Sequence, residues 1–152
     1  MTISINCQDI LTVRSGVICH QVNCKGVMGA GLARAIREKF PIVYQDYRNA
    51  YNQGELELGH VIFSKIQKDP LLYVASLCGQ YNYGRSGQYT NYKALEICFS
   101  KVVGYRNSNF SPARGEIFIP YKLGCGLAGG QWPIVLRLLE RIIPDAIICK
   151  PT

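Results

Sequence analysis

The chain has 152 residues, of which 48% are hydrophobic and 18% are charged, and its formal net charge is +7. A chain of this length suits one core, so we expect a single domain over residues 1–152. The first residues show no basic segment followed by an apolar run, and no stretch approaches the ~18 apolar residues needed to cross a bilayer. Composition therefore argues against a membrane protein or a secreted one and favours a soluble, cytoplasmic protein.

The cysteines and the positive charge limit the chemistry further. There are seven cysteines, an odd number, and no two of them form a pair with zinc-ligand spacing. We therefore expect reduced thiols, no bound metal and no cofactor, and we expect a monomer. The positive charge would attract polyanions, but a basic surface of this size is also ordinary for solubility. Nucleic-acid binding stays an alternative that charge alone does not favour.

Apolar periodicity and turn residues predict strands that alternate with helices. In the first half of the chain we expect strands over 2–6 and 17–22 and then helices over 31–40 and 42–54. A hairpin of strands 58–66 and 71–77 follows, which turns at Asp69-Pro70, and after it a polar loop over 78–92. In the second half we expect a helix from about 89 to 103, a loop over 107–115, a strand over 116–120, a helix over 131–143 and a last strand over 146–150. Several of these strands are continuously apolar. This order predicts a mostly parallel sheet covered on both faces, with binding sites at the carboxyl ends of the strands.

Two glycine-rich loops follow predicted strands, "GVMGAG" at 26–31 and "LGCGLAGG" at 123–130. Glycine lets consecutive backbone N–H groups approach an anion, and the first turn of a helix adds free donors and a partial positive charge. Two such loops could grip a diphosphate from both sides. Each loop alone is equally consistent with a tight turn before a helix. Neither matches the phosphate loop that ends in Gly-Lys-Ser/Thr or the spacing of a dinucleotide fingerprint.

Three motifs in a fixed order carry a family resemblance. Asp9-Ile10 follows the first strand, "VNCKGVMGAGLA" follows the second, and "GCGLAGGQW" follows a late strand. Together they resemble the macrodomain family, in its branch of small stand-alone proteins, which includes yeast-type ADP-ribose 1″-phosphate phosphatases and the terminal ADP-ribose protein glycohydrolases. The resemblance implies a three-layer α/β/α sandwich with a mixed, mostly parallel central sheet, and it implies binding of ADP-ribose.

The same resemblance assigns roles to individual residues. Asp9 would accept a hydrogen bond from the adenine amino group while the Ile10 backbone reads another ring edge, and Asn23 would bind hydroxyls of the distal ribose. Asp9 is otherwise an exposed turn residue or a helix cap, and Asn23 otherwise ties its own loop together. The diphosphate would lie between two rows of residues, with Cys125 contributing through its backbone rather than as a nucleophile. These rows are Gly29, Ala30, Gly31 and Leu32 on one side and Gly124, Cys125, Gly126, Leu127 and Ala128 on the other.

Chemistry is harder to assign than binding. The stand-alone hydrolases that the chain resembles use a lysine after the strand that matches "YVASL" and an aspartate in the second glycine loop. Here the first segment reads "CGQYNYG" and the second position is Ala128, so both groups are missing. His20 stands in "CHQVNCKG", which resembles the yeast-type phosphatase pattern. A histidine that titrates near neutrality could activate water toward a terminal phosphate; the alternative is a strand histidine held by a backbone carbonyl.

The loop "QYNYGRSGQYTNYK" contains tyrosines, glycines and Arg85. The guanidinium of Arg85 could pair with an extra phosphate, because its N–H donors form a fork that matches two phosphate oxygens. The loop is alternatively a solvated surface or a stacking platform for single-stranded nucleic acid.

The sequence therefore predicts a macrodomain that binds ADP-ribose or its 1″-phosphate and hydrolyses the latter with His20 and Asn23. A non-catalytic ADP-ribose reader or scavenger is the second candidate. A hydrolase that removes ADP-ribose from protein or nucleic acid is the third.

Overall fold

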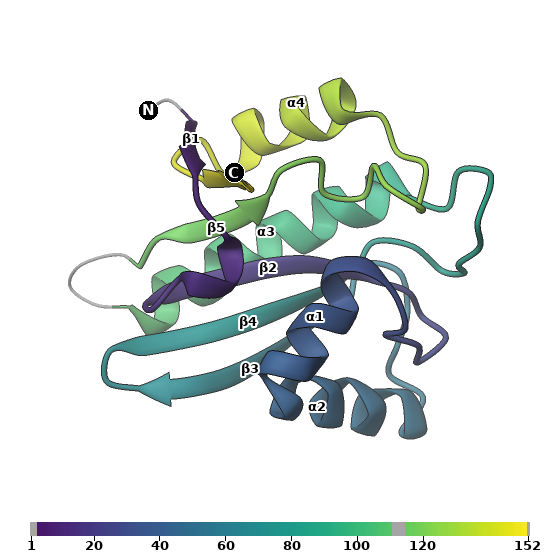
Figure 1. The fold of residues 1–152 in the computed structure, drawn as a ribbon, viewed down its shortest axis with the longest axis horizontal. Coiled ribbons are helices and arrows are strands. Elements are labelled where there is room, and N and C mark those ends of the chain that lie inside the picture. Colours follow the sequence, from purple (N-terminus) through teal and green to yellow (C-terminus); the bar gives the residue numbers. More distant parts are fainter. Residues whose placement is uncertain (1–2, 111–114, 152) are drawn as a thin grey trace.

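A computed structural model describes residues 3–110 and 115–151, which form a twisted sheet with helices on both faces (Figure 1). The strands are β1 (Ser4–Cys7), β2 (Gly16–Val22), β3 (Val61–Lys68), β4 (Leu71–Cys78), β5 (Ile117–Pro120) and β6 (Ile147–Lys150). The helices are the 3₁₀ turn η1 (Ile10–Thr12), α1 (Gly31–Lys39), α2 (Pro41–Asn52), α3 (Tyr92–Asn109) and α4 (Trp132–Ile142).

The six strands lie in the order β1-β6-β5-β2-β4-β3. All neighbouring pairs are parallel except β3 and β4, which form the expected antiparallel hairpin. This arrangement confirms the mixed, mostly parallel sheet. Because β2 lies between β5 and β4, the segments that follow these three strands meet at one edge of the sheet. The two glycine loops and the polar loop after β4 are therefore brought together by topology.

Each face of the sheet carries its own core. Apolar side chains of α3 and α4, such as Phe99 and Leu139, pack on one face. Side chains of η1, α1 and α2, such as Ile10, Ile36 and Tyr47, pack on the other. The sandwich is thus three-layered, as expected. All seven cysteines are free thiols, as expected, and five of them are buried.

Helix α3 differs most from its predicted bounds, because it begins at Tyr92 and continues to Asn109. Its start is set by Asn91, whose side chain accepts a hydrogen bond of 2.9 Å from the Ala94 N–H. Its last turns are held by tertiary contacts: Tyr105 stacks on Phe63 at 3.7 Å between ring centroids, and Arg106 pairs with Asp145 at 3.1 Å. Local sequence pattern does not encode such contacts.

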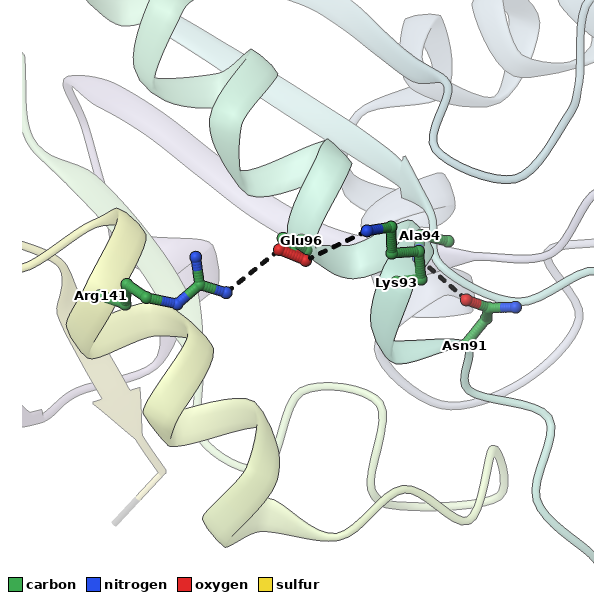
Figure 2. A network of polar contacts seen from close by, with 5 residues as sticks. All are labelled: Asn91, Lys93, Ala94, Glu96 and Arg141. Carbon is green, nitrogen blue, oxygen red and sulfur yellow. Dashed lines mark hydrogen bonds and ion pairs between the residues drawn. The ribbon is translucent and has the colours of Figure 1, made fainter.

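Figure 2 shows how α3 is connected to α4. Arg141 of α4 pairs with Glu96 of α3 at 3.1 Å, and Lys93 approaches the same carboxylate at 4.0 Å. These groups are largely solvent-exposed, and such pairs contribute about 0–1 kcal/mol. The buried apolar face of α3 therefore positions the helix more than its ion pairs do. Within the described residues, no helix is long and apolar enough to cross a membrane.

Candidate functional site

Two adjoining cavities of about 400 Å³ and 260 Å³ lie where β2, β4 and β5 end. Both are lined by residues of the first glycine loop, the second glycine loop and the loop after β4. The residues that line both are Gln21, Ala30, Ala33, Gln80, Leu127 and Ala128. We call the two cavities together the groove. It brings together most of the residues that the sequence proposed for one site.

Asn23 is fixed at the start of the first glycine loop. It is 7% exposed and lines the larger cavity. Its Oδ1 accepts hydrogen bonds from the Lys25 N–H at 2.9 Å and from the Tyr47 hydroxyl at 2.8 Å, and its Nδ2 donates to the Val27 carbonyl at 2.8 Å. The side chain thus ties its own loop together, which was the alternative prediction. An amide carries two N–H bonds, so one remains for a ligand.

Helix α1 begins directly from the first glycine loop, as expected. Its N-cap residue, Ala30, has no capping side chain, and its first turn contains no acidic residue. The N–H groups of Gly31, Leu32 and Ala33 find no acceptor in the described part of the chain. They carry the partial positive charge of a helix N-terminus, and these three residues line the smaller cavity.

The second glycine loop presents donors in a different way from that expected. Helix α4 begins at Trp132, within one residue of its predicted start, and the loop before it folds back on itself through hydrogen bonds from Gly129 N–H to Gly126 O and from Gly130 N–H to Gly124 O. The free donors therefore belong to the loop and not to the helix. Gly126, Leu127 and Ala128 have N–H groups without an acceptor among residues 3–110 and 115–151, and all three line the smaller cavity.

Cys125 lies apart from this row. Its N–H donates to the Lys122 carbonyl at 2.9 Å, and its side chain packs against the core instead of lining either cavity. The structure therefore does not support a backbone contribution from Cys125. Burial raises the pKa of its thiol, although Lys122 opposes this effect, so the thiol is protonated near neutrality. This state agrees with the expectation that Cys125 is not a nucleophile.

His20, near the end of β2, is among the residues that line the smaller cavity. It is 1% exposed, its Nε2 is 2.7 Å from Ser76 Oγ, and its Nδ1 is buried without a partner among the described residues. Burial lowers the pKa of His20 to about 3, because the protein cannot solvate the imidazolium. The near-neutral titration expected from the sequence is therefore wrong for this structure. The partner of the ring is a hydroxyl and not the backbone carbonyl considered as the alternative.

The loop between β4 and α3, residues 79–91, touches both glycine loops. The Cys24 N–H donates to Tyr81 O at 3.0 Å, and the Tyr89 and Thr90 N–H groups donate to Ala128 O at 2.6 and 3.1 Å. Tyr83, Gly84 and Arg85 line the larger cavity beside Asn23. This loop therefore forms one wall of the groove, and Arg85 lines the same cavity as Asn23.

Asp9 and Ile10 lie outside the two cavities. Asp9 caps η1, with its Oδ1 accepting a hydrogen bond of 2.9 Å from the Leu11 N–H, as one alternative predicted. Its other carboxylate oxygen has no partner in the described structure. Ile10 is buried in the core under η1. Both residues follow β1, at the same edge of the sheet as the groove but two strands away from β5.

The charges around the groove suit an anion. Among the described residues, the ionisable side chains that line it are His20, Arg85 and Lys122, together with the phenols of Tyr83 and Tyr121, and no carboxylate does so. The same residues include no group of three or more metal-ligating side chains. Backbone N–H donors, one guanidinium and one ammonium thus define the electrostatic character of the groove.

Four residues of the site were missed by sequence reasoning: Gln21, Tyr47, Gln80 and Thr90. Gln21 and Gln80 line both cavities, Tyr47 holds Asn23, and Thr90 holds the second glycine loop. Gln21 gave one signal, since it and His20 are the two polar residues in the mostly apolar run "VICHQV". Tyr47 gave none, because its spacing in α2 fits a core position.

Known proteins share the sequence pattern and the fold of this chain. The family model of the Macro domain matches residues 19–139. A curated relative from Thermosipho africanus (strain H17ap60334), a "DNA ADP-ribosyl transferase-DNA ADP-ribosyl glycohydrolase fusion protein", is 26% identical over 150 residues. That match covers 89% of this chain and 37% of the relative, so the chain spans little more than a third of the relative's length.

Two solved structures are similar over almost the whole chain. A protein of unknown function from Bacteroides thetaiotaomicron has a TM-score of 0.86 at 26% identity, with 99% of this chain and 98% of that chain covered. Thermosipho africanus DarTG in complex with ADP-ribose has a TM-score of 0.77 at 23% identity, with 99% of this chain and 42% of that chain covered. The second likeness concerns the fold alone.

Proposed function

This chain belongs to the Macro domain family, and we propose that it binds ADP-ribose in the groove between its two glycine loops. One observation supports this proposal above the others. Gly31 to Ala33 and Gly126 to Ala128 present two sets of unpaired N–H groups, and both sets line the same cavity of about 260 Å³. A diphosphate placed there would receive donors from both sides.

The two ends of the ligand follow from this placement. In our proposal the distal ribose enters the larger cavity, where Asn23 has an N–H bond to spare. Adenosine extends the other way, toward Asp9 and Ile10, and the free carboxylate oxygen of Asp9 accepts the adenine amino group. The remaining residues named from the sequence for the diphosphate keep that role, except Cys125.

ADP-ribose is expected to bind with roughly micromolar affinity, about −8 kcal/mol, and AMP is expected to bind at least ~10-fold more weakly. AMP lacks the second phosphate and the distal ribose, so it cannot engage both sets of donors. Isothermal titration calorimetry would measure both affinities, with ADP as an intermediate ligand. Equal affinities for AMP and ADP-ribose would contradict a diphosphate held between the two loops.

Hydrolysis of ADP-ribose 1″-phosphate is a second candidate function, which the position of Arg85 favours. Arg85 lines the same cavity as Asn23, so in this proposal its guanidinium would meet a phosphate on the distal ribose. His20 would act as a neutral imidazole, since burial lowers its pKa to about 3. His20 lines the smaller cavity but is only 1% exposed, its Nε2 bonds to Ser76 Oγ, and its Nδ1 is buried without a partner among the described residues.

An Arg85→Gln variant is expected to bind ADP-ribose 1″-phosphate ~5–10-fold more weakly, while its affinity for ADP-ribose changes less than about twofold, because only the first ligand carries the extra phosphate. Calorimetry with both ligands tests this difference, and an assay of released phosphate tests turnover. Lys93→Gln, on the solvent-exposed side of α3, is the control for the lost charge. Equal weakening for both ligands would contradict a role for Arg85 at the 1″ position.

A second substrate tests whether the chain removes ADP-ribose from DNA instead of releasing phosphate. ADP-ribosylated DNA belongs in the same assay, because the Thermosipho africanus relative carries the name of a DNA ADP-ribosyl glycohydrolase. Loss of ADP-ribose from DNA without phosphate release would replace the phosphatase with a deribosylating hydrolase. If neither substrate is consumed although ADP-ribose binds, the chain is a non-catalytic reader.

A further inference from the structure

Gln21 occupies a position that neither its strand nor the binding of ADP-ribose explains. It is the last residue but one of β2, and its amide is packed between two glycines. A Cβ atom added at Gly79 would lie 2.5 Å from Gln21 Oε1, and one added at Gly124 would lie 2.9 Å from the same atom. Three chain segments thus meet at one amide: the end of β2, the start of the 79–91 loop and the second glycine loop.

The Gln21 amide acts as a hydrogen-bond donor to two other side chains. Gln21 Nε2 donates to Gln80 Oε1 at 2.8 Å and to Thr90 Oγ1 at 3.0 Å. The Thr90 hydroxyl, which accepts that bond, donates its own proton to the Gly124 carbonyl at 2.6 Å. Thr90 is 4% exposed, so solvent does not compete for its hydroxyl. The chain of donors from Gln21 through Thr90 to Gly124 is called the amide relay below.

The Gly124 carbonyl is the point at which the relay meets the proposed diphosphate site. It also accepts the Gly130 N–H at 2.8 Å, which closes the second glycine loop. Gly124 has a φ of 73°, a conformation that other residues rarely adopt, and the donors Gly126 to Ala128 follow directly. At the other end of that loop, Ala128 O accepts the Tyr89 and Thr90 N–H groups. The second glycine loop and the 79–91 loop are therefore anchored to the sheet as one unit.

We propose that Gln21 and Thr90 are positioning residues, which hold the diphosphate-binding loop and the Arg85-bearing loop in their binding geometry through the amide relay. This inference rests on the proposed ADP-ribose function and adds to it two residues that need not touch the ligand. Because the two loops share one anchor, loss of either side chain affects both ends of the groove. A residue that only stabilised the core would affect folding and leave the preference among ligands unchanged.

Isosteric variants test the relay. Gln21→Met removes both donors at nearly constant length, Thr90→Val removes the hydroxyl at constant shape, and Thr90→Ser restores it. Gln67→Met is the matched control, since Gln67 donates a single amide hydrogen bond, 2.9 Å to Arg14 O, away from the groove. Affinities for ADP-ribose and ADP are measured by calorimetry, and global stability by thermal unfolding.

Gln21→Met and Thr90→Val are each expected to bind ADP-ribose about tenfold more weakly, because the loss of roughly one hydrogen bond changes a binding constant by about that factor. Thr90→Ser is expected to stay within about threefold of the parent protein, and Gln67→Met to match it. The variant that combines Gln21→Met with Thr90→Val is expected to be no weaker than the weaker single variant, because both changes interrupt one relay. Parental affinity in both single variants, or additive losses in the double variant, would overturn the proposal.

A second measurement needs no ligand. Arg85 is an exposed trypsin site within the loop that the relay holds. Cleavage after Arg85 is expected to be about 5–10-fold faster in Gln21→Met and Thr90→Val, whereas global unfolding stays cooperative. If the parent protein does not bind ADP-ribose, the proposed function fails, and this cleavage rate still decides the relay. Unchanged cleavage in both variants would overturn the relay whatever the ligand.

Discussion

A Gly126→Val variant is expected to lose at least ~100-fold of its affinity for ADP-ribose while remaining folded, a change of about 2.7 kcal/mol. Gly126 lies in the middle of the second glycine loop and lines the cavity that holds both sets of free N–H groups. A valine there would place a branched side chain where backbone must approach a phosphate.

The protein can accept this substitution because nothing opposes the new side chain. A Cβ atom at Gly126 would meet no atom within 4 Å, and its φ is not positive. Gly124 is different: its φ is 73°, and a Cβ atom would lie 3.0 Å from the Thr90 hydroxyl. Loss of binding in a Gly124 variant would therefore not distinguish a blocked site from a distorted loop.

Gly104→Val provides the matched control, because Gly104 is exposed on α3 and its added Cβ atom would also meet nothing within 4 Å. Calorimetry measures binding in both variants, and circular dichroism with thermal unfolding checks their folding. If folded Gly126→Val protein binds ADP-ribose as well as the parent protein does, the second glycine loop does not hold the diphosphate. The donors of α1 would then have to act alone.

The elements that the sequence predicted well are those whose signals are local. The β3–β4 hairpin turns at Asp69-Pro70, and α1 begins from the first glycine loop at Gly31, as their turn and breaker residues indicated. The two glycine loops meet because β2 and β5 are neighbours, which a parallel sheet made plausible but did not determine. Pattern reasoning thus located the loops, and topology brought them together.

The errors arise where tertiary contacts override local pattern. Helix α3 runs past Val103 because Tyr105 and Arg106 have distant partners, and the second glycine loop folds back on itself before α4 begins. The backbone of Cys125 was expected to face the ligand, but its N–H is used inside that loop. Spacing along a chain cannot show which N–H groups are already occupied.

The same limit applies to Gln21 and His20, which are neighbours in β2. Adjacent residues of a strand point to opposite faces, so the two side chains enter different surroundings. Gln21 reaches the loops beside Thr90, whereas His20 is buried against Ser76. The sequence suggested a titrating histidine, and only the packing around it shows that its ring stays neutral.

That neutrality predicts how stability depends on pH. Burial lowers the pKa of His20 to about 3 in the folded protein, whereas in the unfolded chain it returns to its ordinary value near 6.5. Between these values the unfolded chain binds the proton and the folded protein does not. His20 therefore leaves the free energy of unfolding unchanged above pH 6.5. As the pH falls from 6.5 toward 3, the free energy of unfolding decreases by up to about 1.4 kcal/mol per pH unit, because only the unfolded chain gains the proton.

A His20→Gln variant, whose amide can still reach the Ser76 hydroxyl, is expected to lose this dependence. Free energies of unfolding from urea titrations at pH 7, 6, 5 and 4.5 would show a shallower decline in the variant than in the parent protein. His60→Gln, a change at the second of the two histidines, is the control and is expected to follow the parent curve. Parallel curves for His20→Gln and the parent protein would mean that His20 becomes protonated without unfolding, which would restore it as a group able to transfer protons near neutral pH.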